Sequence, residues 1–262
     1  MAFLNLFPIP RRYERVPGAL MFALAGAMAI IYWKKRAPLT LGLLAGSVVL
    51  LALVYLVRFR QREEWDAFFQ RENTRLLQMR GSSGPARYVA EQRAALKKIR
   101  HPELKLSAKL NLCAGLLANA DPGGTLEVLE AIQPEKIPNP TLLLLYWTQA
   151  LSAFLQRRDL AGAETAYETA MGILPDVSDV VKVSFMPLEI QYRLARQEYV
   201  LALDQLNEIP KQGLDEASQD LLTALRVNAL RGLGAREKAD KLAAQLADHD
   251  LIPSTRALLR CS

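Results

Sequence analysis

The residues of this chain that could do acid–base or metal chemistry are few and scattered. It has only two histidines, His101 and His249, and the second is flanked by Asp248 and Asp250. A metal site or a catalytic histidine pair needs such side chains gathered at defined spacing. Motifs of that kind, such as H-E-x-x-H, G-x-S-x-G and G-x-x-x-x-G-K, do not occur in the sequence. We therefore predict two surface histidines, no enzymatic activity, no metal and no cofactor.

Two long uncharged stretches, 16–33 and 39–57, stand out near the start of the sequence. At about 1.5 Å per residue, each would form a helix of roughly 27–29 Å, close to the ~30 Å hydrocarbon core of a bilayer. A short connector, 34–38, carries three positive charges between them. These features predict a transmembrane hairpin over 16–57. A buried hairpin of a soluble protein is the alternative, which the charged flanks disfavour.

The distribution of arginine and lysine predicts the orientation of that hairpin. Eight arginines lie beyond its outer ends, against three basic residues in the connector. By the positive-inside rule, the chain ends then lie in the cytoplasm. The two cysteines, Cys113 and Cys261, are too widely separated to suggest a disulfide framework, which agrees with that compartment. We predict a plasma-membrane protein with two spans and cytoplasmic termini.

A G-x-x-x-G motif at Gly42 and Gly46 gives the second span a surface of small residues. Small residues let helix backbones approach closely in lipid. The motif would either pack the two helices of the hairpin together or join two copies of the chain as a homodimer.

The net charge of +6 is not spread evenly along the chain. Segments 1–15, 34–38 and 58–80 carry +2, +3 and +2, whereas the remainder, 81–262, carries −1. Nucleic-acid binding usually needs a strongly basic patch on the binding domain itself. The charge pattern therefore indicates contact with a lipid bilayer and argues against a nucleic-acid partner.

Composition divides the chain further. Residues 1–15 form a basic segment, and 58–80, free of Gly and Pro, is expected to continue the second span as a juxtamembrane helical stalk. "GSSGP" at 81–85 is expected to be a linker. The rest, 86–262, is predicted to be a helical domain.

Within that domain, apolar residues recur every three or four positions, and the interruptions contain Pro or Gly. No stretch alternates as a strand would. The predicted helices are 86–100, 103–120, 124–132, 141–157, 160–174, 180–196, 199–209, 217–233 and 236–249.

One stretch, Leu144 to Pro175, resembles a tetratricopeptide repeat, a helical hairpin that stacks with its neighbours. Small residues in its two helices would let them approach, and large residues would fill the space between them. The positions that match the family's pattern are Trp147, Ala150, Leu151, Phe154, Ala163, Tyr167, Ala170 and Pro175.

Weaker matches follow at Ala202 and Ala239, which lie 39 and 37 residues after their predecessors, against 34 in the family. The resemblance extends over about residues 104–248. The overall fold class is therefore predicted to be all-α, with the transmembrane hairpin followed by an irregular, tetratricopeptide-like α-solenoid.

The resemblance implies a protein-binding scaffold or adaptor, anchored in the membrane, whose concave side binds a peptide or protein at the cytoplasmic face. An extracytoplasmic assembly or sensor module is the alternative, and a spacer that only holds complexes away from the bilayer is a third possibility. The partner itself is not identified. The positions that the resemblance assigns to the concave side are Leu145, Thr148, Ser152, Leu155 and Gln156.

Overall fold

The structure, a computed structural model, describes residues 66–260 except 69, 73, 76–78, 138 and 210–213. This described part contains helices and no strand, which confirms the all-α prediction for it. The chain divides into two compact units, one of residues 7–72 and one that contains residues 73–262. Only a few helical residues of the first unit are described, so the fold below is that of the second.

The predicted localisation is wrong for the part of the chain that the structure describes. No helix there is both long and apolar enough to cross a membrane. The longest, α6 (Pro140–Arg157), has 18 residues, but Thr148, Gln149 and Gln156 interrupt its apolar sequence. The predicted spans, 16–33 and 39–57, lie outside the described residues.

The other membrane-related predictions also fall outside what the structure describes. They concern Gly42 and Gly46, residues 1–15 and the connector. The predicted stalk, 58–80, is described only in part, and its residues 66–68, 70–72 and 74–75 are helical. Residues 81–83 of the predicted linker form a turn, and α3 begins directly after it.

The helical segments expected from sequence periodicity are all present, with ends that differ by a few residues at most. One helix, α12, was not predicted. The α-helices of the larger unit are α3 (Gly84–Leu96), α4 (Pro102–Ala118), α5 (Pro122–Glu130), α6 (Pro140–Arg157), α7 (Leu160–Ile173), α8 (Asp179–Ala195), α9 (Tyr199–Glu208), α10 (Glu216–Gly232), α11 (Arg236–Gln245) and α12 (Pro253–Arg260).

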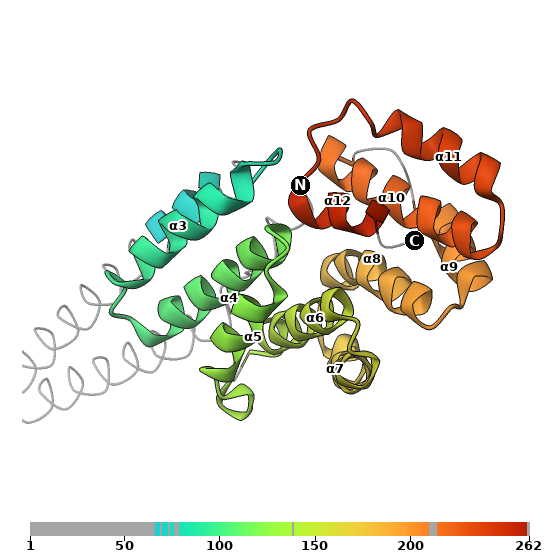
Figure 1. Cartoon of the computed structure of the whole chain (residues 1–262). Helices are drawn as coiled ribbons and strands as arrows, with labels where there is room; N and C mark the ends of the chain where they lie inside the picture. Colours follow the sequence, from blue (N-terminus) through green and yellow to red (C-terminus); the bar gives the residue numbers. More distant parts are fainter. Residues whose placement is uncertain are drawn as a thin grey trace, which may run out of the picture. The chain divides into compact units, whose positions relative to one another are not determined.

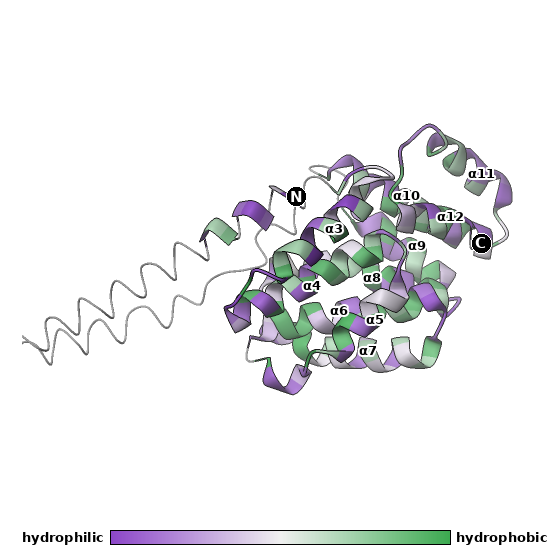
Figure 2. Cartoon of the chain, turned by 60° about the vertical axis from the view of Figure 1, so that its left-hand side comes forward, coloured by the Kyte–Doolittle hydropathy of each residue, from purple (hydrophilic) through white to green (hydrophobic). Residues whose placement is uncertain are grey.

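Eight of these helices form four consecutive hairpins, α4/α5, α6/α7, α8/α9 and α10/α11 (Figure 1). In each hairpin the second helix packs on its own first helix, and α5, α7 and α9 also pack on the first helix of the next hairpin. The first helices α4, α6, α8 and α10 pack on one another in that order. Most helices carry both hydrophobic and hydrophilic segments, as amphipathic helices do (Figure 2).

The same turn joins the two helices of every hairpin. One residue in it adopts a left-handed conformation, and the next residue donates its N–H to the carbonyl five residues earlier, as in a Schellman motif. These left-handed residues recur at intervals of 38, 39 and 37 residues, so the structure has a period close to that of the sequence. They are Ala120, Arg158, Gln197 and Gly234, with φ of 57°, 60°, 63° and 77°.

Two further positions keep the same distance from this turn in every hairpin. Five residues after the left-handed residue, the second helix has a small residue that is 0% exposed; these are Thr125, Ala163, Ala202 and Ala239. Seven residues before it, the first helix has a 0% exposed side chain; these are Cys113, Leu151, Ile190 and Val227. The hairpins therefore bury equivalent positions despite their different sequences.

Two glycines give a matched test of this packing. A Cβ at Gly115 of α4 would lie 2.6 Å from Cδ1 of the buried Tyr88, whereas a Cβ at Gly172 of α7 would meet nothing within 4 Å. Gly115→Ala should therefore lower the free energy of unfolding by about 1–3 kcal/mol through overpacking. Gly172→Ala should raise it by about 0.4–1 kcal/mol, because alanine restricts the unfolded chain. Urea unfolding of the full-length variants measures both changes, and equal midpoints would contradict the packing described.

Candidate functional site

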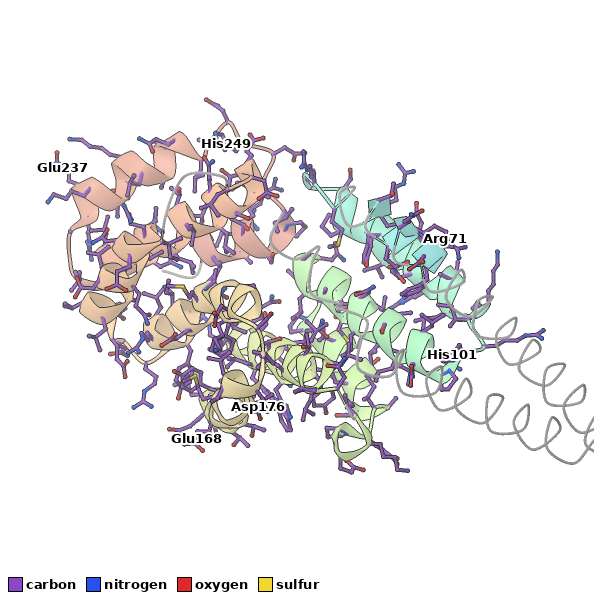
Figure 3. All side chains as sticks on the ribbon, turned by 180° about the vertical axis from the view of Figure 1, so that it is seen from behind. Arg71, His101, Glu168, Asp176, Glu237 and His249 are labelled. Atoms are coloured by element: carbon purple, nitrogen blue, oxygen red, sulfur yellow. The ribbon has the colours of Figure 1, made fainter. Side chains whose placement is uncertain are left out.

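In the described part of the chain, the residues that could do metal or acid–base chemistry form one close pair and no candidate metal site. No group of three or more His, Cys, Asp or Glu residues is placed there to bind a metal. His101 precedes α4 and His249 lies between α11 and α12, well apart (Figure 3). The exposed His249 has a specific partner on α10, since its Nδ1 lies 2.7 Å from Oδ1 of Asp220. Nothing in the sequence indicated this pair.

Cys113, the described cysteine, is a core residue. Its side chain is 0% exposed, in the first helix of the first hairpin. Burial raises the pKa of the Cys113 thiol from 9.0 to about 12, so the reactive thiolate is strongly disfavoured. A nucleophilic role for this thiol is therefore not supported.

A cleft of about 850 Å³ lies on the side of the larger unit formed by the first helices. It is the strongest candidate for a functional site, because residues far apart in the sequence converge on it. Helices α6, α8, α10, α11 and α12 all contribute to its lining, as does Tyr199 at the start of α9. The lining residues are Leu155, Gln156, Gln191, Leu194, Ala195, Tyr199, Leu225, Asn228, Arg231, Gly232, Arg236, Asp240, Leu258 and Leu259.

The lining repeats from one hairpin to the next. The residues three and two positions before the left-handed residue line the cleft in three consecutive hairpins; they are Leu155 and Gln156, Leu194 and Ala195, and Arg231 and Gly232. The residue six positions before it lines the cleft in the last two of these hairpins, as Gln191 and Asn228. The common turn thus brings equivalent side chains to one surface.

Of the five residues assigned to the concave side, the structure brings two into this cleft, Leu155 and Gln156. Leu145, Thr148 and Ser152 are not part of its lining. The hydroxyl of Thr148 donates to the carbonyl of Leu145 in its own helix, 2.9 Å away. The contributions of α8 and α10 were not predicted, although the positions in those helices that are equivalent to Leu155 and Gln156 could have indicated them. That of α12 was not predicted either.

The repeat positions proposed from the sequence occupy the hairpin α6/α7 as a packed set. Ala150, Leu151, Ala163 and Ala170 are buried; Trp147, Phe154 and Tyr167 are half-buried, and Pro175 is exposed in a short 3₁₀ turn. The ring of Tyr167 stacks on Tyr192 of α8, with centroids 4.2 Å apart. This stack ties the second helix of one hairpin to the first helix of the next.

Two side-chain amides give the cleft its hydrogen-bonding character. The Nε2 group of Gln156 donates to the carbonyl of Leu117 at 3.2 Å, and the Nδ2 group of Asn228 donates to the carbonyl of Leu258 at 3.1 Å. The other amide atoms, Gln156 Oε1 and Asn228 Oδ1, are buried and have no hydrogen-bond partner among the residues described. A buried acceptor without a partner loses the hydrogen bonds that it made to water, so a turn of either side chain that let its oxygen accept an N–H from a bound molecule would recover one.

Charged residues also line the cleft. The guanidinium of Arg231 lies 3.7 Å from Oδ1 of Asp240 and donates to the carbonyl of Leu259 at 2.9 Å. Arg236 is a further charged residue of the lining. With amides, aliphatic side chains and these charges, the cleft offers a ligand both apolar contact and hydrogen-bonding groups.

No family model matches the chain, and comparisons with curated proteins and with solved structures found no match. The function must therefore be inferred from the geometry of the cleft.

Labelling of Cys113 with a thiol reagent tests its burial and its raised pKa. In a Cys261→Ser background at pH 8, the pKa shift alone should slow the reaction about 10³-fold relative to an exposed thiol, since the thiolate is the reacting species. Urea should restore the ordinary rate. The pKa of the Cys113 thiol is higher in the folded protein than in the unfolded chain. Its contribution to the free energy of unfolding therefore decreases as pH rises from 9 towards 12. Fast labelling of the folded protein would contradict the packing.

Proposed function

We propose that this chain is a non-catalytic protein-interaction scaffold or adaptor whose larger unit binds a segment of a partner protein. The partner would lie along the surface made by the first helices α6, α8 and α10. The observation that carries the proposal is that equivalent positions of consecutive hairpins converge on one cleft, which aliphatic, amide and charged residues line. A surface of this kind offers a polypeptide both apolar contact and hydrogen bonds.

The arrangement of the hairpins supports a second part of the proposal, that the larger unit is an irregular α-solenoid of tetratricopeptide type. In repeats of this type each unit buries its apolar face against its neighbours, so that a row of units shares one core. The packing of α5, α7 and α9 on both flanking first helices follows that scheme. The longer period of 37–39 residues is the main departure from the family's 34.

A library of random peptides tests the proposal and does not require the partner to be identified. Displayed peptides are selected on the full-length chain, and the enriched peptides are then tested on a variant with a blocked cleft, Gln156→Arg/Gln191→Arg/Ala195→Arg. These long charged side chains should fill the cleft and lower the affinity at least tenfold, which is about 1.4 kcal/mol. Fluorescence anisotropy measures that loss.

The matched control puts the same added charge on exposed positions of α7, as Ala161→Arg/Thr165→Arg/Met171→Arg. This control should bind the selected peptides like the wild-type chain. Circular dichroism shows whether both variants keep their helices. Selection of no peptide, or only of peptides that bind the blocked variant equally well, would refute a role of the cleft in partner binding.

A further inference from the structure

The last described helix, α12 (Pro253–Arg260), lies against the first helices of the hairpins, where the proposed partner would bind. It packs on α10 and on α4, the first helices of the last and the first hairpin. Leu258 packs against the core cluster that contains Ile190 and Leu225. Leu258 and Leu259 both pack against a second cluster, which contains Ala224. A short amphipathic helix is thus already bound on this surface.

The contacts that α10 makes with the C-terminal end of α12 are to backbone carbonyls, whereas the α12 side chain Arg256 bonds to the segment just before its own helix, at the carbonyl of Leu251. Asn228 donates to the carbonyl of Leu258 at 3.1 Å, and Arg231 donates to the carbonyl of Leu259 at 2.9 Å. The last four carbonyls of any helix have no partner within the helix, and they carry the negative end of its dipole. Asn228 and Arg231 therefore bind a feature common to all helix C-termini.

The cleft continues past these two leucines and is not filled by α12. Leu258 and Leu259 form part of its lining, together with Leu155 and Gln156 of α6. Gln156 lines this remaining space, and its amide oxygen is buried without a hydrogen-bond partner among the residues described. A polypeptide that continued beyond a helix placed like α12 would contact Gln156, and a turn of that side chain would let its amide oxygen accept an N–H.

We propose that the partner segment is an amphipathic helix with two adjacent leucines near its C-terminal end, and that α12 holds this place until the partner displaces it. This inference rests on the proposed function, and it specifies both the class of ligand and its control. The mode of binding is a helix laid in an apolar groove. A partner that also fills the remaining cleft makes contacts that α12 does not make, and these favour the exchange.

Two features of α12 fit a displaceable occupant. It is an eight-residue helix, and the turns and irregular backbone of residues 246–252 separate it from α11. A tethered segment of this kind competes at an effective concentration on the order of millimolar. Free ligands of modest affinity are then excluded, and a partner must bind more tightly than α12 does.

The first experiment uses a fluorescent peptide with the sequence of residues 249–260 as the probe. In the full-length chain, Leu258→Ser/Leu259→Ser should loosen the resident helix. We expect the probe to bind this loosened variant at least tenfold more tightly than the wild-type chain. Adding Arg231→Gln to the loosened variant should weaken probe binding again, at least tenfold. A matched control, Leu160→Ser/Leu201→Ser, changes two exposed leucines of α7 and α9 and should bind the probe like the wild-type chain.

Equal binding of the probe to the wild-type and loosened chains, or binding to neither, would overturn the proposal. Hydrogen exchange on the unmodified chain gives a second measurement that does not depend on how the variants fold. Amides of α12 should exchange at least tenfold faster than those of α10, through local opening. A library-selected peptide should accelerate that exchange further.

The two proposals fail differently. If selected peptides bind the cleft but leave α12 exchange unchanged, the scaffold function stands and the displacement of α12 is refuted. If the α12 amides exchange together with those of α10, the helix is a fixed part of the fold, and the displacement is again refuted. If no selected peptide depends on the cleft, the scaffold function itself fails.

Discussion

Each hairpin depends on the close approach of its second helix to its first, which one small buried position allows. Thr125, Ala163, Ala202 and Ala239 occupy that position, and all are 0% exposed. A larger side chain there would separate the helices and disturb packing that has little free space. Each second helix except α11 also packs on the first helix of the next hairpin. A separation within one hairpin would therefore also disturb the packing of its neighbour.

The left-handed turn sets where this approach occurs along each helix. It ends the first helix at a fixed distance from its buried side chain and starts the second helix at a fixed distance from the small residue. Only one of the four turns has a glycine at the left-handed position, Gly234. The other three place Ala120, Arg158 and Gln197 in a conformation that costs a non-glycine residue roughly 1 kcal/mol. The surrounding packing must therefore favour the turn, and equivalent residues line the cleft as a result.

Periodic apolar residues and Pro- or Gly-bearing breaks were enough to predict the helices of the hairpins. Pro187 illustrates a limit of local rules, since it lies well inside α8 (Asp179–Ala195) and the helix continues through it. The short α12 was missed because "PSTRALLR" has few apolar residues and is stabilised by contacts with distant helices. A plasma-membrane localisation was predicted from residues that the structure does not describe, and the described helices do not support it.

The candidate site was harder to predict than the helices. The repeat pattern led to Leu155 and Gln156, because the position of a residue within its helix determines the surface that it reaches. The pattern also led to Thr148, whose hydroxyl instead bonds within its own helix. The pairing of Asn228 and Arg231 with carbonyls of α12 depends on the fold of the whole unit, since about thirty residues separate the partners in sequence. No local pattern carries that information.

Different contacts in the cleft would determine the affinity for a bound helix and its orientation. Contacts of Leu258 and Leu259 with apolar residues of the first helices would supply most of the binding free energy, because burial of apolar area dominates such interfaces. The carbonyl contacts of Asn228 and Arg231 fix which end of a helix points into the cleft. Without an occupant, the groove would expose the apolar residues that Leu258 and Leu259 now cover, and exposed apolar surface favours association with other proteins. A helix from the same chain covers that surface, and a partner that presents the same leucines and the same free carbonyls can replace it.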